Sequence, residues 1–287
     1  MIRKINKWFH IVRPGTLSAA IAPVTVGSIV AAQSAPLKPL VCIVTFISAI
    51  SIQIASNLIN DFYDFKKGLD KEGRLGPRRA ISEGTTTPGA MKRAILIDIV
   101  IALLSGLYLV FVGGYPIIII GLTALFFAWI YTATPYSLSY LGIADIFVLL
   151  FFGPVATVGT TYLQTGTFSI PSFWLGMVNG SISMAILTVN NLRDHASDKK
   201  AGKKSLVVRF GKRFAEYEYL LLYLLSILYL SMAGKLFFSY FIVLIGIALF
   251  IRLHKTTGKK YNKMLIFTGL SNVLFAILYY LDFLTHS

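Results

Sequence analysis

The sequence of 287 residues is poor in charge and nearly free of cysteine. Only 14% of its residues are charged, against roughly 25% in a typical soluble domain, and 56% are hydrophobic, with a mean hydropathy of +0.72. The single cysteine, Cys42, excludes a disulfide framework and any metal site built from cysteines. Together these shortages exclude a water-soluble enzyme, and the 21 Phe and 15 Tyr exclude a disordered chain.

Apolar runs near the length that a helix needs to cross the hydrocarbon core of a bilayer recur along the chain. We therefore expect one domain, residues 1–287, that is an all-α integral membrane protein with nine transmembrane helices. The expected spans are 16–35, 39–60, 91–112, 115–133, 143–163, 172–191, 214–233, 236–253 and 264–284.

Acidic residues are also scarce, 12 against 27 Lys and Arg, which gives a net charge of +15. In a soluble protein this excess would indicate nucleic-acid binding. If nine helices alternate, however, every Lys and Arg except Lys38 and Lys235 falls on one side of the membrane. The positive-inside rule then predicts a cell-membrane protein with its N-terminus in the cytoplasm and its C-terminus outside, and no nucleic-acid partner. For residues 1–15 we expect a short interfacial helix, with a disordered basic tail as the alternative.

The few acidic residues gather in or beside the two expected cytoplasmic loops, 61–92 and 192–213, in two similar motifs. Each motif has an Asn, an Asp four residues later and a further Asp after three or four more, then Lys-Lys and a Gly. Their polar residues are Asn57, Asn60, Asp61 and Asp64 in the first motif, and Asn190, Asn191, Arg193, Asp194 and Asp198 in the second. The motifs end helices that are four spans apart, which predicts a parallel internal repeat with the ninth helix added.

The spacing of these motifs places their polar groups on one face of each helix. Such a stripe is costly at membrane depth unless it faces a cavity, and carboxylates that meet there repel one another unless a cation lies between them. Oxygen ligands favour Mg²⁺, which commonly joins carboxylates to substrate phosphates, and nearby Lys and Arg suit the rest of a diphosphate. Loop carboxylates that balance neighbouring bases are the alternative, which the repetition of the motif disfavours.

The two motifs resemble those of the UbiA family of intramembrane aromatic prenyltransferases. Asn57 and Asp61 match the first family motif, and Asp194 and Asp198 match the second, but Phe65 occupies the usual third acidic place, one residue after Asp64. The segments Arg74-x-Gly-Pro-Arg78 and Asn190-Asn191-x-Arg193-Asp194, with Arg-Pro-x-Thr-Leu from Arg13, resemble the branch that uses 1,4-dihydroxy-2-naphthoate. The similarity runs from about residue 8 to 213.

The resemblance implies a UbiA-type helical bundle and Mg²⁺-dependent transfer of a polyprenyl group from an allylic polyprenyl diphosphate to 1,4-dihydroxy-2-naphthoate. The acceptor would lose its carboxylate, giving demethylmenaquinone in menaquinone biosynthesis. The implied ligands of the metal are Asn57, Asp61, Asp64, Asp194 and Asp198. The candidates for substrate binding are Asn57, Asn60, Arg74, Arg78, Asn190, Asn191, Arg193, Lys199 and Lys203. Asp145, a carboxylate inside an expected span, is a further catalytic candidate that would steady the allylic cation or an acceptor hydroxyl.

An allylic cation needs protection from water and aromatic faces around it. The candidates are Phe126, Phe127, Trp129, Tyr131, Tyr136, Phe147 and Phe151. A long isoprenoid tail also requires a lateral opening to membrane lipid. Two alternatives stay open at this point. The acceptor could be 4-hydroxybenzoate, homogentisate, haem or a glycerophosphate lipid, or the chain could be a secondary transporter, although transporters place polar groups near the membrane midplane.

Overall fold

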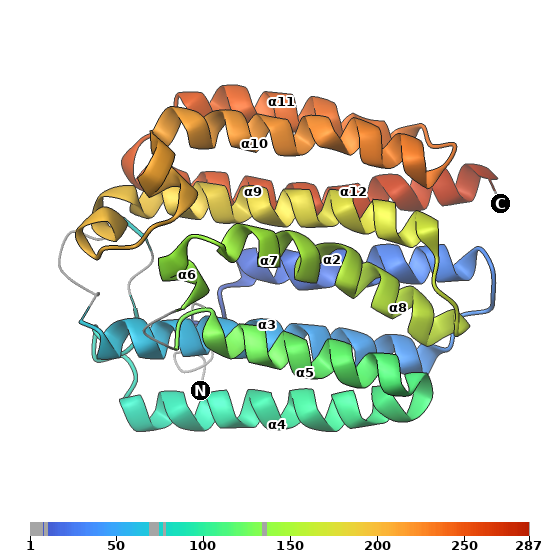
Figure 1. Ribbon diagram of the computed structural model, residues 1–287, viewed down its shortest axis with the longest axis horizontal. Helices are drawn as coiled ribbons and strands as arrows, with labels where there is room; N and C mark the ends of the chain where they lie inside the picture. Colours follow the sequence, from blue (N-terminus) through green and yellow to red (C-terminus); the bar gives the residue numbers. More distant parts are fainter. Residues whose placement is uncertain (1–7, 9–10, 69–74, 77–78, 134–136, 287) are drawn as a thin grey trace.

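The computed structural model describes residues 8, 11–68, 75–76, 79–133 and 137–286, and its regular structure is entirely helical in these residues. The long helices lie side by side along one axis (Figure 1). The helical elements, long and short, are in chain order α2 (Pro14–Ala32), α3 (Pro39–Lys66), α4 (Pro88–Gly113), α5 (Tyr115–Ile130), α6 (Leu138–Leu141), α7 (Ala144–Leu150), η1 (Phe151–Val155), α8 (Ala156–Thr165), α9 (Ile170–Lys200), α10 (Leu206–Ala233), η2 (Phe238–Tyr240), α11 (Phe241–His254), η3 (Gly258–Lys260) and α12 (Tyr261–His286).

Seven helical segments among the described residues are long and apolar enough to cross a membrane, and two shorter apolar segments, Tyr115–Ile130 and Phe238–His254, occupy the other two expected spans. Large apolar side chains cover the outside of the bundle: Leu107 and Phe111 of α4 are 68% and 89% exposed. An exposed apolar surface of this kind is stable in lipid and not in water. The expected class, an all-α membrane protein, is confirmed, whereas nine membrane crossings stay a prediction.

The two motif helices are longer than their expected spans. Helix α3 continues to Lys66 and α9 to Lys200, where hydropathy placed the ends at 60 and 191. The four motif carboxylates therefore lie on rigid helix ends and not in the loops 61–92 and 192–213. The difference arises because hydropathy marks only where the apolar side chains end. The backbone hydrogen bonds of each helix continue through the polar motif residues, whose side chains bind one another and nearby bases.

The expected span 143–163 is a bent segment, α7–η1–α8, with its bend at Gly153 and Pro154. A Cβ atom on Gly153 would lie 2.7 Å from the Gly176 carbonyl oxygen and 2.8 Å from the Gly180 Cα atom of α9. Because such distances exclude a side chain, glycine allows the bend to pack directly against α9. Pro154 removes a backbone donor at the same point.

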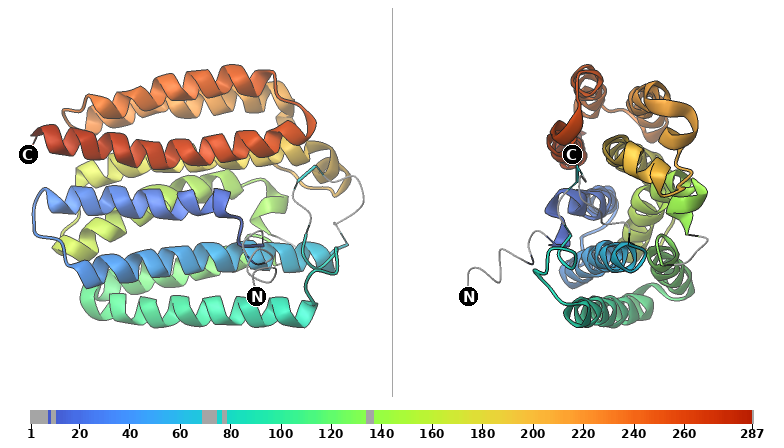
Figure 2. Two further views of the ribbon diagram at one scale, coloured as in Figure 1. Left: turned by 180° about the vertical axis from the view of Figure 1, so that it is seen from behind. Right: turned by 90° about the vertical axis from the view of Figure 1, so that its left-hand side faces the viewer.

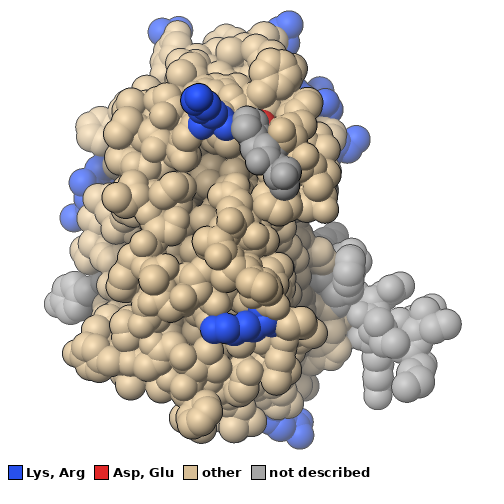
Figure 3. All heavy atoms as spheres, turned by 90° about the vertical axis from the view of Figure 1, so that its right-hand side faces the viewer, with Lys and Arg blue, Asp and Glu red and all other residues tan. Residues whose placement is uncertain are grey.

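The ends of α3, α9 and α11 meet at one end of the bundle, opposite the C-terminus (Figure 1). Figure 2 shows α3–α5 on one side of the cross-section and α10–α12 on the other, with α2, α7 and α9 between them. Figure 3 shows the end of the bundle at which the C-terminus lies, and this face is largely uncharged, with a few separate Lys and Arg side chains.

The largest buried core lies among α9–α12 and includes Tyr219 and Tyr223. The opposite half instead surrounds a cavity.

Candidate active site

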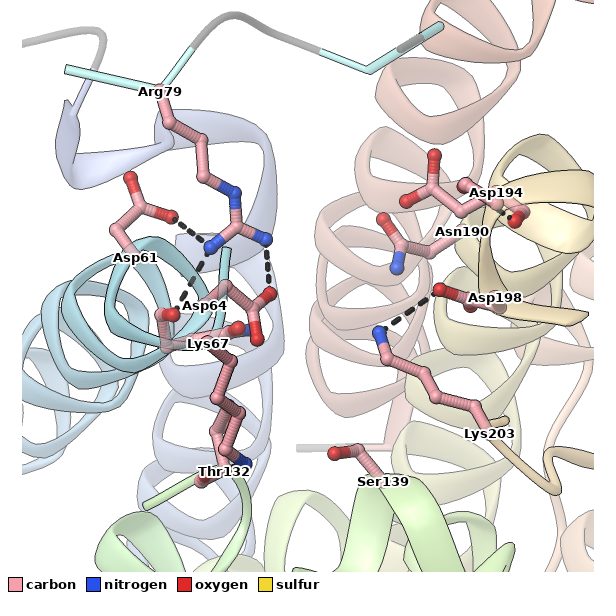
Figure 4. A network of polar contacts seen from close by, with 12 residues as sticks. Asp61, Asp64, Lys67, Arg79, Thr132, Ser139, Asn190, Asp194, Asp198 and Lys203 are labelled. Carbon is pink, nitrogen blue, oxygen red and sulfur yellow. Dashed lines mark hydrogen bonds and ion pairs between the residues drawn. The ribbon is translucent and has the colours of Figure 1, made fainter. Parts of the chain in front are cut away.

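The two acidic helix ends lie opposite each other at the end of the bundle. Asp61 and Asp64 are on α3, Asp194 and Asp198 are on α9, and all four are buried. Figure 4 shows the first pair on one side and the second pair on the other, with Arg79 and Lys203 reaching toward them. The predicted convergence of the two motifs at one place agrees with this arrangement.

Arginines pair with the carboxylates of the first motif. Arg79 Nη2 forms an ion pair with Asp64 Oδ2, and Arg79 Nη1 lies 3.4 Å from Asp61 Oδ1. Nη1 also donates to the Asn60 carbonyl oxygen at 3.0 Å, and Arg13 Nη2 forms a second ion pair with Asp61. The two cations reduce the repulsion between neighbouring carboxylates that are removed from water.

Bases of the second motif hold its own carboxylates. Arg193 Nε and Nη2 donate to the two carboxylate oxygens of Asp194 at 2.9 and 2.7 Å, and Nη2 donates to Asn190 Oδ1 at 2.6 Å. Lys203 Nζ lies 2.9 Å from Asp198 Oδ1. The two-pronged pair between Arg193 and Asp194 fixes the orientation of that carboxylate as well as its charge.

A polar cavity of about 40 Å³ lies between the motifs. Its wall includes Arg13, Asn60, Asp64, Arg79, Tyr131, Ser139, Asp145, Asn190, Asn191, Asp194, Asp198, Lys203 and Ser205. Asp64 Oδ1 is buried and has no hydrogen-bonding partner among the described residues. The carboxylate and amide oxygens fit Mg²⁺, which proteins usually hold through one or two carboxylates together with water and substrate phosphates. In the described part of the chain no three His, Cys, Asp or Glu side chains form a complete cage, so phosphate oxygens and water would have to complete the coordination.

Asn57, like Asp61 and Arg193 of the motifs, does not line this cavity. Its Nδ2 donates to the Val12 carbonyl oxygen at 3.0 Å and to Thr16 Oγ1 at 2.9 Å. These bonds hold the turn that contains Arg13, whose φ of 56° is unusual for a residue other than glycine. In this structure Asn57 therefore supports the arginine that pairs with Asp61.

The remaining predicted substrate-binding residues divide into three groups. Asn60, Asn190, Asn191 and Lys203 line the cavity, and Arg193 supports it through Asp194. Lys199 is exposed and lies outside the cavity wall. Arg74 and Arg78, together with most of the expected interfacial segment 1–15, fall outside the described residues.

Tyr140 and Lys67 are site residues that the sequence reasoning missed. Lys67 Nζ donates to the Thr132 carbonyl oxygen at 2.8 Å and lies 4.7 Å from the centre of the Tyr140 ring, and Lys203 Nζ lies 5.8 Å from that centre. Burial lowers the pKa of Lys67, although nearby Asp64 opposes this effect. Burial and the motif carboxylates raise the pKa of Tyr140 to about 12. Tyr140 is therefore a neutral ring between the lysines that follow the two motifs.

The structure brings Asp145, the predicted intramembrane carboxylate, to the wall of the polar cavity. Asp145 lies at the start of α7, is buried and shares this wall with Tyr131 and Ser139. This position agrees with the expectation that a carboxylate within an apolar segment faces a cavity.

A second, apolar cavity of about 470 Å³ lies among α2–α5 and α7–α8, and Tyr131 lines both cavities. Phe127, Phe147 and Phe151 form part of its wall, and the Phe127 ring lies 4.3 Å from that of Phe147 between centres. Of the other predicted aromatic residues, Phe126 and Trp129 are exposed and do not line either cavity, and Tyr136 lies outside the described residues.

The fold and the site together define a multi-pass membrane protein. Its polar cavity is lined by acidic and basic side chains and adjoins an apolar cavity. The model of the UbiA prenyltransferase family matches residues 20–280, and the chain belongs to this family. The resemblance that the two acidic motifs indicated is thereby confirmed.

Similar proteins include 1,4-dihydroxy-2-naphthoate octaprenyltransferase of Escherichia coli (strain K12), which is 39% identical over 74% of this chain and 70% of that protein. The protein of the same name from Haemophilus influenzae is 33% identical over 80% of this chain and 78% of that protein. The structure of a UbiA homolog from Archaeoglobus fulgidus bound to DMAPP and Mg²⁺ matches with a TM-score of 0.65 at 17% identity, over 96% of this chain and 99% of that chain. This structural match shows the shared fold.

Proposed function

We propose that the protein transfers a polyprenyl group from an allylic polyprenyl diphosphate to 1,4-dihydroxy-2-naphthoate, with Mg²⁺ as cofactor. The reaction releases diphosphate and the acceptor carboxylate, the latter as carbon dioxide, and gives demethylmenaquinone in its reduced, quinol form. The observation that carries this proposal is the junction at Tyr131, where a small polar cavity adjoins a much larger apolar one. A prenyl diphosphate has the same two parts, an anionic head and an apolar tail.

The first role of the site is to bind the diphosphate. Asp61 and Asp64 from α3, with Asp194 and Asp198 from α9, would hold Mg²⁺, and Asp64 Oδ1 lacks a hydrogen-bonding partner in the described part of the chain. When bound, the metal supplies positive charge to the leaving diphosphate. Lys203 would add a second cation to the same group. Fixed cations at a developing negative charge usually make the largest contribution to catalysis of this kind.

The second role is to protect the allylic carbon after the carbon–oxygen bond weakens. Tyr131 lies where the two cavities adjoin, and Phe127 and Phe147 line the apolar side. Aromatic faces stabilise a nearby cation, and their apolar edges exclude water that would otherwise capture it. The apolar cavity would hold the part of the tail nearest the diphosphate, and the rest would extend among membrane lipids.

The third role is to place the acceptor. Asp145 lines the polar cavity on the same wall as Tyr131, so its carboxylate would accept a hydrogen bond from a hydroxyl of the acceptor ring. That bond would increase electron density in the ring and orient the carbon that forms the new bond. We further propose that the motif end faces the cytoplasm of a cell membrane, because the basic loops lie at this end.

The test is transfer of a radiolabelled prenyl group by the purified protein in detergent. Mg²⁺ and one acceptor are supplied at a time: 1,4-dihydroxy-2-naphthoate, 4-hydroxybenzoate, homogentisate, haem or a glycerophosphate. We expect product with the naphthoate alone, and loss of product with EDTA and in the variants D61N and D194N. D98N is the matched control, because Asp98 is a carboxylate on α4 that lines neither cavity.

The outcomes separate the alternatives. Product with another acceptor would retain the reaction and reject the proposed substrate. An absence of product with every acceptor, by protein that remains folded, would reject the enzyme and leave a transporter as the interpretation to examine.

A further inference from the structure

The first turn of α12 contains a polar residue that joins the two halves of the site, Asn262. We propose that Asn262 is a positioning residue for diphosphate binding, acting through Arg193 and Asp194. This inference rests on the proposed function, since it assigns a role within the same site. Asn262 belongs to the C-terminal part of the chain, to which the two acidic motifs do not extend.

Both polar atoms of the Asn262 amide make hydrogen bonds, and to different partners. Its Oδ1 accepts from Arg193 Nη1 at 3.1 Å, and its Nδ2 donates to the Leu75 carbonyl oxygen at 2.9 Å. The residues that it joins are far apart in the sequence: Arg193 is on α9, whereas Leu75 follows the first motif. One side chain from a third segment therefore links the second motif to the chain that follows the first.

The Arg193 guanidinium is constrained on every edge. Nε and Nη2 bind Asp194, Nη2 also binds Asn190, and Nη1 binds Asn262. A planar guanidinium whose three nitrogens all have partners has one orientation, and it transfers this orientation to the carboxylate that it holds at two points. Loss of the Nη1 contact would allow the group to tilt and Asp194 to move with it.

A glycine also lies close to the Arg193 guanidinium. A Cβ atom on Gly76 would lie 3.0 Å from both Cζ and Nη2 of Arg193, so the backbone at Gly76 approaches the guanidinium closely. Three residues further on is Arg79, a chain length that spans at most about 11 Å. Asn262 therefore holds the backbone at Leu75, four residues before Arg79 in the sequence, as well as the pair between Arg193 and Asp194.

The experiment compares N262A with N272A in steady-state kinetics of the full-length protein in detergent. Asn272 is the matched control, because it is a buried asparagine on the same helix whose amide donates to Ser183 Oγ at 3.1 Å and does not line the polar cavity. We expect N262A to raise the KM for prenyl diphosphate about tenfold, the effect of one lost hydrogen bond to a charged group. The KM for the aromatic acceptor should stay within about twofold, a change of about 0.4 kcal/mol.

The variant G76A perturbs the same guanidinium by steric contact and keeps Asn262, so it decides the question if N262A does not fold. It should show the same selective rise in KM. An unchanged KM for prenyl diphosphate in folded N262A or G76A, or an equal rise in N272A, would overturn the proposal.

A separate measurement keeps this inference distinct from the proposed function. If the wild-type protein transfers no prenyl group, the proposed function fails. The inference is then tested by the increase in thermal stability that Mg²⁺ and inorganic diphosphate produce together. Wild type and N272A should show the increase and N262A should show a smaller one, whereas an equal increase in all three proteins refutes the role of Asn262.

Discussion

Replacement of Arg79 by methionine tests whether this chain's own cations hold the acidic site together. Arg79 and Asp64 have side chains that are 4% and 3% exposed, and Arg79 also lies beside Asp61 and donates to the Asn60 carbonyl oxygen. Methionine preserves most of the apolar volume and removes the charge. Removal of one partner from a buried ion pair leaves an uncompensated charge, so we expect the free energy of unfolding to fall by about 3 kcal/mol.

Magnesium should restore much of this loss. In the variant, Arg79 no longer competes with Mg²⁺ for the carboxylate of Asp64. That carboxylate should therefore bind Mg²⁺ more tightly. A ligand that binds only the folded state at about 100 times its Kd adds about 2.7 kcal/mol. The assay is unfolding by SDS in mixed micelles, with and without MgCl₂, followed by circular dichroism for the wild type and the R79M variant.

The double variant R79M/D64N is the control, because it removes both charges together and should recover part of the stability without Mg²⁺. An R79M protein as stable as the wild type would show that the ion pair contributes nothing to folding. Equal stabilisation of both proteins by Mg²⁺ would show that Arg79 and the metal do not compete for the same carboxylates.

Four further substitutions have separate expected results. Y140F should retain the wild-type KM for prenyl diphosphate and Y140L should raise it, because the ring and not the hydroxyl lies beside the two lysines. D282A should lower the free energy of unfolding by about 3 kcal/mol with KM unchanged, since Asp282 accepts three backbone N–H groups and a hydroxyl between α12 and η2. G121F should raise the KM for a long polyprenyl diphosphate and not for a short one, because Gly121 faces open space in the apolar cavity. K203M should raise the KM for prenyl diphosphate, with K199M as its exposed control. Steady-state kinetics and SDS unfolding check these four results. Equal KM values for prenyl diphosphate in Y140F and Y140L, or in K203M and K199M, would contradict the corresponding prediction. An equal rise in KM for long and short diphosphates would contradict the prediction for G121F.

The sequence predicted the helical membrane fold and the meeting of the two motifs because both depend on local signals. Apolar runs of sufficient length identify spans, and the spacing of Asp194 and Asp198 places them on one helix face. Helix phase also separates the lysines, since Lys199 directly follows Asp198 and must point elsewhere. Lys203 returns to Asp198 only after the turn at Gly202, whose φ is +73°.

The partners of the carboxylates could not be predicted in this way. Arg13 and Arg79 are two of many basic residues at one end of the bundle, and nothing in the sequence assigns either of them to a particular carboxylate. Asn262 follows Arg193 by 69 residues, and no sequence motif indicates that the two side chains are in contact. Such pairings depend on how α2, α9 and α12 pack, which is set by distant parts of the chain.

The sizes of the two cavities determine how a diphosphate enters the site. The polar cavity, at about 40 Å³, has room for a few water molecules and not for a diphosphate with a hydrated metal. Some internal ion pairs must therefore open when substrate binds. Arg79 and Arg193 have side chains that are each 4% exposed, whereas those of Lys203 and Arg13 are 17% and 23% exposed. The two more exposed bases lose less by leaving their carboxylates, so we expect them to turn to the phosphate oxygens, which would leave Asp198 and Asp61 able to hold Mg²⁺. The kinetic comparison of K203M with K199M tests this exchange, because a base that only stabilises the fold would change the stability of the protein and leave the KM for prenyl diphosphate unchanged.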